Sequence, residues 1–284
     1  MNSWSEWIGR EERASDTSDV GLARRWLGTF DLAQDISGPL PQSAHWCLAV
    51  PDLPSARLGP DGHPARDGGG NSFLPPIPLE RRMWAGSTVD FLAPIPVGAE
   101  ISRLSRVAKI EEKEGRSGAL VFATVEHEWV ADGMPAVREV QSLVYREAPS
   151  GPSAPAQLPT AEVGEWDAVH EFTPDAPLLF RYSALTFNTH RIHYDADYVR
   201  DVEHYPGLVV HAPLTATRLL LLAARELGGQ ALTRFAFRAL SPAYAGEKVT
   251  LGLRRAGENV EFAAFAGSGP HGSRRIMEAS GVLA

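Results

Sequence analysis

The stretch PLTATRLLLLAAREL, residues 213–227, decides the fold class. It contains no glycine, and its only proline stands at the first position, where a helix tolerates it. A pair of glycines at 228–229 follows directly, as expected just after the C-terminus of a helix. Apolar residues surround the middle of the stretch on nearly all sides. The pattern therefore predicts one long helix that is buried inside the protein.

Strand-like segments follow this helix toward the C-terminus. In the first segment Val249, Leu251 and Leu253 occupy every second position, which is the period of a half-buried strand. A buried helix beside an antiparallel sheet predicts an α+β architecture. The segments read KVTLGLRR, NVEFAAFAG and SRRIMEASGVL.

An internal repeat predicts that this architecture occurs twice. Residues 92–100 read LAPIPVGAE and residues 240–247 read LSPAYAGE, so both follow Leu-x-Pro-x-x-x-Gly with a glutamate soon after. Strand-like segments follow both copies. After the first copy they lie at 120–130 and 136–145, with the turn residues DGMP at 132–135 between them. The shared position before a run of strands favours duplication over chance similarity.

Two segments rich in proline and glycine interrupt this pattern. The segment EAPSGPSAPAQLPT, residues 147–160, has little apolar surface to bury, and we interpret it as a linker. It divides the chain into an N-terminal unit, residues 1–146, and a C-terminal unit, residues 161–284. Residues 51–80 are predicted to form an irregular loop, which is either mobile or a lid over a cleft.

Composition excludes several classes of protein. The net charge of −8 and the pI of about 5.6 argue against a general nucleic-acid binder, which needs a dense basic face. Because Cys47 is the only cysteine, the chain can form neither an intrachain disulfide nor a cysteine-based zinc site. The N-terminus lacks a signal peptide, and the longest apolar run, residues 219–224, is too short to span a bilayer. We expect a soluble cytoplasmic protein that binds no membrane.

The stretch FNTHRIHYDAD, residues 187–197, concentrates side chains that could bind a metal. His190 and His193 are three positions apart, whereas the usual paired-histidine zinc signature places its histidines four apart with a glutamate between them. We therefore expect no metal, although this region holds several potential ligands: His190, His193, Asp195, His204 and His211.

Acid–base chemistry is the interpretation that we favour for the same stretch. A histidine can give and take a proton near neutral pH, and an asparagine amide can accept one hydrogen bond while it donates another. Together, His193 and Asn188 could hold and activate one water molecule. The alternative is that His193 is a buried, hydrogen-bonded histidine without a catalytic role.

The stretch YPGLVVHAPL, residues 205–214, leads into the buried helix. Gly207 allows a tight turn, and His211 and Ala212 stand directly before the proline that begins the helix. Free backbone N–H groups at a helix N-terminus bind anions and could polarise the carbonyl of an ester or a thioester. The alternative is a helix that simply starts with proline.

Taken together, these stretches resemble the MaoC-like dehydratases and hydratases. The family's motif is approximately Ser-Gly-Asp-x-Asn-Pro-Leu-His, and this chain reads TFNTHRIH, with His193 at the histidine and Asn188 at the aspartate position. The stretch GLVVHAPL is similar to the family's Gly-x-x-x-His-Gly segment, with Ala212 in place of its last glycine. Residues 74–101 resemble the family's N-terminal half, so the resemblance covers most of the chain.

The resemblance implies a double hot-dog fold, in which each of two units wraps an antiparallel sheet on a central helix. It also implies reversible hydration of an α,β-unsaturated acyl-CoA by the C-terminal unit. His193 and Asn188 would activate water, and the Ala212 amide would polarise the thioester carbonyl, in a substrate site bordered by Gly207 and His211. The N-terminal unit would shape the acyl pocket, with Trp84 as a wall. The resemblance further implies that no metal or redox cofactor is needed and that the substrate is carried on coenzyme A. It also implies a homodimer.

The substrate expected from the resemblance is a branched C5 dicarboxylyl-CoA. The stretches SALTFNTHRIHYD and RRMWAGS are similar to a sub-branch that hydrates mesaconyl-C4-CoA or itaconyl-CoA to citramalyl-CoA. Arg191 and Arg181 are candidates for binding the second carboxylate, or alternatively for binding a phosphate of CoA. Two other functions remain open: an (R)-3-hydroxyacyl-thioester dehydratase of fatty-acyl chains, and a non-catalytic subunit that binds acyl-CoA.

Overall fold

The computed structural model describes residues 4–66, 72–115, 118–148, 160–161, 164–267 and 273–284. The helices are α1 (Val20–Thr29), α2 (Ala176–Leu185), α3 (Ala196–Asp201) and α4 (Ala212–Leu227), and short 3₁₀ turns lie at Ser5–Trp7, Ala44–Cys47, Ser55–Arg57 and Arg191–His193. The strands are β1 (Glu11–Thr17), β2 (Arg81–Phe91), β3 (Glu100–Gly115), β4 (Gly118–Ala131), β5 (Met134–Arg146), β6 (Thr160–Ala161), β7 (Ala168–Phe172), β8 (Leu232–Ala239), β9 (Val249–Ala256), β10 (Asn259–Ala266) and β11 (Ser273–Leu283).

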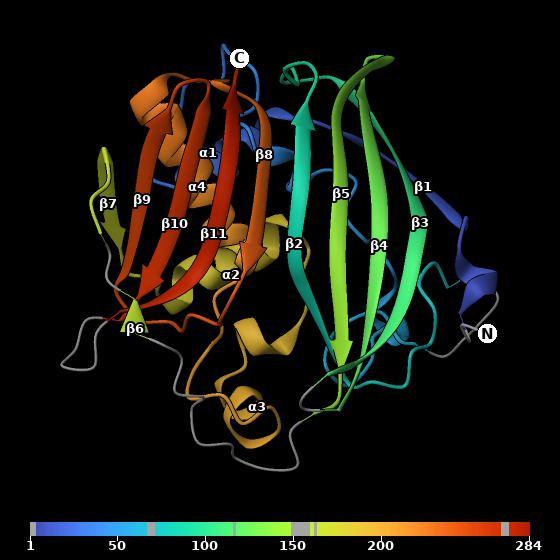
Figure 1. The fold of residues 1–284 in the computed structure, drawn as a ribbon. Coiled ribbons are helices and arrows are strands. Elements are labelled where there is room, and N and C mark those ends of the chain that lie inside the picture. Colours follow the sequence, from blue (N-terminus) through green and yellow to red (C-terminus); the bar gives the residue numbers. More distant parts are fainter. Residues whose placement is uncertain (1–3, 67–71, 116–117, 149–159, 162–163, 268–272) are drawn as a thin grey trace.

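The strands form one 11-stranded antiparallel sheet, and Figure 1 shows it with the strands in front of helices α1, α2 and α4. Its order is β1-β3-β4-β5-β2-β8-β11-β10-β9-β7, with β6 paired to β11. The order is symmetric about the junction of β2 and β8, so that β3, β4 and β5 correspond to β9, β10 and β11. The predicted duplication and the α+β fold class are thereby confirmed.

The two halves meet where β2 pairs with β8. The pairing runs from Gly86 opposite Arg238 to Asp90 opposite Arg234. A Cβ atom at Gly86 would lie 2.3 Å from the carbonyl oxygen of Phe237, so only glycine permits this close approach of the backbones. The junction makes one continuous sheet and places the inner faces of both halves on the same side.

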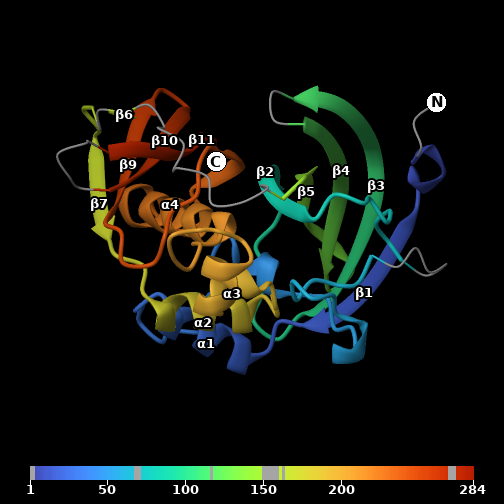
Figure 2. The same cartoon turned by 90° about the horizontal axis from the view of Figure 1, so that it is seen from below.

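The second half contains the long helix that the sequence predicted. Nine residues of α4 are buried, and the helix lies inside the curve of β8–β11, as Figure 2 shows. The first half is different, since its short helix α1 packs mainly against α2, and loops face the inner side of β2–β5 (Figure 2). This difference leaves room for a cleft beside the N-terminus of α4.

The structure describes most of one of the two proline- and glycine-rich segments and little of the other. Of the expected linker, residues 149–159 lie outside the described residues. In the expected loop at 51–80, the described part contains one 3₁₀ turn and one isolated bridge, between Leu58 and Pro64, so its irregular character is confirmed.

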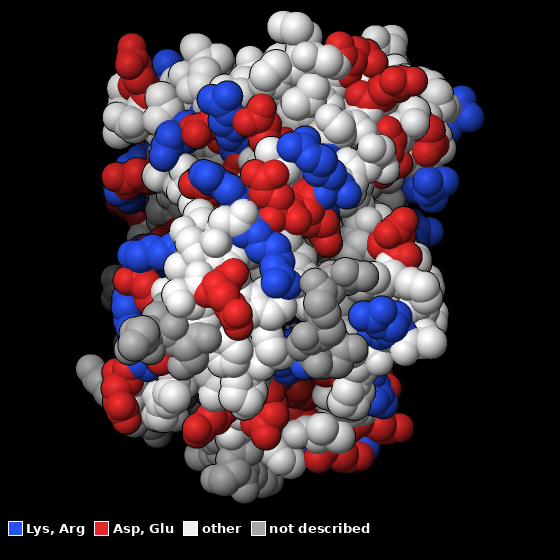
Figure 3. Space-filling view, turned by 90° about the vertical axis from the view of Figure 1, so that its right-hand side faces the viewer, with Lys and Arg blue, Asp and Glu red and all other residues white. Residues whose placement is uncertain are grey.

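Charges of both signs mix on the face shown in Figure 3. Pairs such as Arg106–Glu126, at 2.6 Å, join the neighbouring strands β3 and β4. On this face, the described residues form no continuous basic surface of the kind that nucleic-acid binding requires.

Among the described residues, we find no helix with the length and apolar character needed to cross a membrane.

Candidate active site

A cleft of about 2360 Å³ opens between the two halves. Its walls come from strands β2–β5, from the loop before β2, and from the segment that leads into α4. The sequence-predicted residues that line it are His193, Asn188, His211, Ala212 and Trp84. The fold therefore brings together the predicted catalytic pair, the helix N-terminus and the predicted wall.

His193 is buried and lines the cleft. Its Nδ1 lies 2.7 Å from the carbonyl oxygen of Val209, which can only accept a hydrogen bond. The proton of the neutral ring therefore sits on Nδ1, and Nε2 keeps its lone pair. Burial lowers the pKa of His193 to about 4, so the ring is neutral at pH 7 and can act as a base.

His211 stacks on the ring of His193 and caps the N-terminus of the long helix α4. The two rings are stacked with centroids 3.5 Å apart, and Nε2 of His211 lies 2.9 Å from the hydroxyl of Ser183. His211 is the N-cap residue of α4, and its carbonyl accepts the first intrahelical bond from Thr215. The Ala212 N–H has no acceptor among the described residues and belongs to the positive end of the helix.

Hydrogen bonds hold both the side chain and the backbone of Asn188. Its side-chain Oδ1 accepts from the backbone N–H of His190 at 3.0 Å, and its backbone N–H donates to the Ser183 carbonyl at 2.8 Å. An aspartate could make the same contact to His190. The substitution therefore keeps the local turn, but it removes a negative charge from the cleft.

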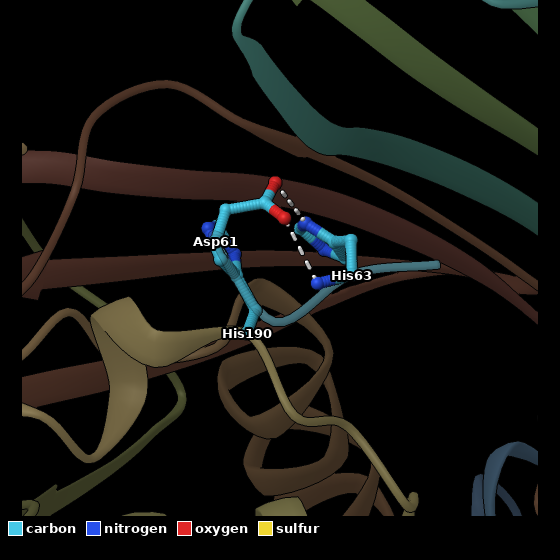
Figure 4. Close-up of side chains that lie close together, drawn as sticks. All are labelled: Asp61, His63 and His190. Carbon is cyan, nitrogen blue, oxygen red and sulfur yellow. Dashed lines mark hydrogen bonds and ion pairs between the residues drawn. The ribbon is translucent and has the colours of Figure 1, made fainter. Parts of the chain in front are cut away.

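A second pair of groups, Asp61 and His63, lies near His193, with the ring of His190 between the two histidines. Figure 4 shows how Asp61 holds His63 by two contacts: Oδ2 lies 3.0 Å from Nδ1, and Oδ1 accepts from the His63 N–H at 3.0 Å. The His63 ring lies 3.9 Å from the ring of His190, which in turn lies 5.5 Å from that of His193. A row of imidazoles thus connects the loop before β2 to the active-site histidine.

Hydrogen bonds attach the loop that carries this pair to the segment after α2. The Arg191 N–H donates to the Asp61 carbonyl at 2.9 Å, and the Thr189 hydroxyl donates to the Gly62 carbonyl. A Cβ atom at Gly62, where φ is +86°, would lie 1.9 Å from the Thr189 carbonyl oxygen. Glycine is therefore required for this docking.

Asp61, His63 and His190 also have the spacing of metal ligands. One ligand atom from each lies within 4.8 Å of the others. However, Nδ1 of His63 is already bonded to Asp61, and the positive charge of Arg82 acts on all three groups. A neighbouring cation opposes metal binding. The earlier candidate Asp195 lies elsewhere, because it caps α3 and pairs with Arg191.

The structure corrects the placement of three predicted substrate-binding residues. Arg191 does not line the cleft: it pairs with Asp195 at 2.8 Å and donates to the Pro60 carbonyl. Arg181 is exposed and donates to the Gly28 carbonyl of α1. Gly207 lies in a bend outside the cleft lining and does not need the left-handed conformation. The two arginines are thus held by partners outside the cleft lining.

Arg82 on β2 is one of the cations that line the cleft. It is half-buried, lines the cleft and lies opposite Tyr145 on β5. Among the described residues, no carboxylate forms an ion pair with it. Its charge helps to lower the pKa of His63 and of His190, which places it close to the catalytic cluster.

The N-terminal wall of the cleft carries a buried polar cluster. Trp46 Nε1 donates to Glu139 at 3.0 Å, and His45 lies 3.6 Å from the same carboxylate oxygen. On the neighbouring strands, Ser105 and His127 are 2.8 Å apart. A wall with these groups suits a polar acyl group better than a long alkyl chain, because an alkyl chain offers them no hydrogen bond and shields them from water.

The buried histidines predict that the protein loses stability in acid. Burial lowers the pKa of His193, His63 and His127 from 6.5 to about 4, so the unfolded chain binds more protons than the folded one between these values. The stabilisation is complete above pH 6.5 and is lost as the pH falls toward 4. We expect the Tm to be nearly flat from pH 7 to 8 and to fall steeply below 6.5. In a His127→Gln variant the slope should be smaller, and equal slopes would contradict the assignment.

Sequence reasoning missed Asp61, His63, Arg82 and the cluster around Glu139. The local signal for the first two was the DGH triplet at 61–63, in which an aspartate can bond the backbone two residues later. That signal indicates a turn and gives no information about a site 130 residues away in the sequence. Arg82 carried no distinguishing signal beside its neighbour Arg81, which pairs with Glu203 at 2.7 Å.

Comparisons with known proteins agree with this geometry. The sequence family hydroxyacyl-thioester dehydratase type 2 matches residues 43–245. The chain is 39% identical over 283 residues to the mesaconyl-C(4)-CoA hydratase of Chloroflexus aurantiacus, covering 96% of this chain and 95% of that protein. Over 88 residues it is 39% identical to the mitochondrial hydroxyacyl-thioester dehydratase type 2 of Schizosaccharomyces pombe, covering 30% and 29% of the two chains.

Solved structures share the fold at low sequence identity. A MaoC-like dehydratase from Phytophthora capsici aligns with a TM-score of 0.70 at 14% identity, over 97% of this chain and 96% of that one. The Mycobacterium tuberculosis protein RV0216, described as having a double hotdog fold, aligns with a TM-score of 0.57 at 15% identity, over 98% and 96%. The chain thus belongs to the hydroxyacyl-thioester dehydratase type 2 family of MaoC-like, double hot-dog proteins.

Proposed function

We propose that this protein is a hydro-lyase that reversibly hydrates an α,β-unsaturated acyl-CoA, with a C5 dicarboxylyl-CoA as its substrate. The observation that carries the proposal is the neutral, buried His193 beside the N-terminus of α4. One group can activate water there, and the other can polarise a carbonyl within the same cleft.

The proposed mechanism is a polar addition of water. The thioester oxygen accepts a hydrogen bond from the Ala212 N–H, and the positive end of α4 stabilises the negative charge that develops on that oxygen. His193 Nε2 accepts a hydrogen bond from the water and activates it for attack at Cβ, and the Asn188 amide helps to orient it. The electrons of the double bond move to Cα, which then takes a proton on the same face.

Mesaconyl-C4-CoA is the substrate that we favour, with citramalyl-CoA as product. The relative from Chloroflexus aurantiacus carries this substrate in its name and aligns over nearly the whole chain. Arg82 offers a second, independent support, because it lies near the catalytic cluster without a carboxylate partner among the described residues. A guanidinium binds a carboxylate by two parallel hydrogen bonds. Itaconyl-CoA carries the same charge and is the next candidate.

Further parts of the proposal concern organisation and cofactors. We propose that residues 161–284 form the catalytic unit and residues 1–146 form the acyl pocket. We also propose a cytoplasmic homodimer that uses neither a metal nor a redox cofactor, since the addition of water involves no net oxidation or reduction and needs only groups that transfer protons and polarise the carbonyl. Light scattering of the purified protein would measure the oligomeric state.

The experiment follows the loss of enoyl-thioester absorbance with mesaconyl-C4-CoA, itaconyl-CoA and crotonyl-CoA. We expect rapid turnover of a dicarboxylyl ester and slow turnover of crotonyl-CoA. Arg82→Gln should lower kcat/KM for the dicarboxylyl ester by about 10- to 100-fold, the value of a lost charged hydrogen bond, and leave crotonyl-CoA unchanged. Arg138→Gln is the matched control, because Arg138 is exposed and pairs only with Glu128.

Each other outcome has a definite meaning. Preference for crotonyl-CoA, with affinity rising as the chain lengthens, would assign the fatty-acyl dehydratase reaction of the family name instead. Binding of CoA esters without turnover would assign a non-catalytic subunit.

A further inference from the structure

Asp61 and His63 form an ionisable pair that the proposed mechanism leaves unused, and the charge of His63 acts on His193. Both side chains are largely buried, with 17% and 15% of their surfaces exposed, and His63 lines the cleft. They come from the loop before β2, in the half of the chain that contains neither His193 nor Asn188.

The carboxylate of Asp61 fixes the tautomer of His63. Although burial raises it, hydrogen bonds and the charge of His63 lower the pKa of the Asp61 carboxyl to about 2, so it is ionised. It therefore accepts from Nδ1 of His63, and the lone pair of that ring lies on Nε2. A full negative charge 3.0 Å away stabilises an imidazolium ion at His63.

His193 lacks such a charge. Its Nδ1 bonds to the neutral carbonyl of Val209, and residue 188 is an amide, where the family's usual motif has a carboxylate. His63 therefore has a carboxylate partner at hydrogen-bond distance, and His193 has a neutral one. The ring of His190 lies between those of His63 and His193, so the three imidazoles form one continuous row.

We propose that Asp61 and His63 form the second acid–base pair of this site and replace the carboxylate that is missing at position 188. The inference rests on the proposed hydration reaction. While His193 orients and activates the water, His63 Nε2 takes the proton as the oxygen bonds to Cβ. The same proton passes from His63 to Cα when the double-bond electrons arrive there. His63 ends neutral, so one water is added and no other reactant is needed.

In this proposal His63 is a catalytic residue and Asp61 is a positioning residue that acts through it. We expect Asp61→Asn and His63→Gln each to lower kcat by about 10²- to 10³-fold, with KM changed less than threefold. The Tm should stay close to that of the unchanged protein. Asp197→Asn is the matched control, because Asp197 is an exposed residue of α3 that pairs with Arg200.

A rescue separates chemistry from structure. Asn188→Asp restores a carboxylate at the family's position and keeps an oxygen acceptor for the His190 N–H. We expect the kcat of the double variant Asp61→Asn/Asn188→Asp to be at least about tenfold higher than that of Asp61→Asn alone. A merely structural role for Asp61 predicts a lowered Tm and no rescue. Without any substrate, ¹⁵N spectra of histidine-labelled protein should show Nδ1–H at His63, and loss of that preference in Asp61→Asn.

The outcomes distinguish the two levels of the proposal. Turnover by the unchanged protein that is lost in His193→Gln but retained in Asp61→Asn and His63→Gln overturns only the second acid–base pair. No turnover of any enoyl-CoA overturns both. Activity that a chelator removes and Zn²⁺ restores would assign Asp61, His63 and His190 to a metal instead, and would also overturn the inference.

Discussion

Replacing His193 with glutamine is expected to lower kcat by about 10²- to 10⁴-fold, the usual contribution of a positioned base. The reason is local: the Nε2 lone pair of a neutral, buried ring is the acceptor on which water activation depends. Glutamine keeps a polar side chain of similar length but has no basic nitrogen. The measurement is the initial rate of loss of enoyl absorbance at saturating thioester.

The control for this variant is His170→Gln. His170 lies on β7 at the far edge of the sheet, where its Nδ1 contacts Arg225, and it does not line the cleft. Its replacement should leave kcat within twofold. Equal Tm values for the two variants would show that His193→Gln is folded. A folded His193→Gln with more than a tenth of the original kcat would contradict the role that we assign to His193.

The pH dependence of kcat/KM gives an independent check on the same residue. Since burial holds the pKa of His193 near 4, the base stays unprotonated down to that pH. The acid limb of the profile should therefore lie well below 6.5, provided that the rates are taken before the protein unfolds in acid.

Much of the fold could be predicted because it depends on local patterns. The buried helix was expected at 213–227 and occurs at Ala212–Leu227, since an uninterrupted apolar stretch between a proline and two glycines has few alternatives. The strand SRRIMEASGVL occurs at Ser273–Leu283. The repeat at 92–100 and 240–247 predicted the duplication, and its two copies lie directly after β2 and β8, the strands that pair at the centre of the sheet.

The site was predicted only as far as it is contiguous in the sequence. His193, Asn188 and Ala212 come from one stretch and do line one cleft. Arg191 and Arg181 lie outside the cleft lining, because their partners are local or belong to a packed helix; the spacing of Arg191 and Asp195, four residues apart, already favours an ion pair. Arg82 and the Asp61–His63 pair reach the cleft through tertiary packing, which no local pattern encodes.

Replacing Ala212 with proline is expected to lower kcat by about 10²- to 10³-fold while the helix stays intact. Proline removes the backbone N–H that we assign to the thioester oxygen, and the loss of one such donor costs about 3–4 kcal/mol of transition-state stabilisation. Position 212 is the first residue of α4, where proline fits, and the preceding His211 already has the extended conformation that proline requires, with φ −62° and ψ 131°.

Ala212→Gly is the matched control, because it keeps the N–H and carries the residue that the family usually has at this position. It should retain kcat within about threefold, since glycine at a helix N-terminus costs little. The comparison isolates one hydrogen atom: both variants remove the same methyl group, but only proline removes the donor. If a folded Ala212→Pro protein matched Ala212→Gly in kcat, polarisation of the thioester would have to come from another group. The Leu214 N–H would be the next candidate, because it is the following donor in the first turn of α4.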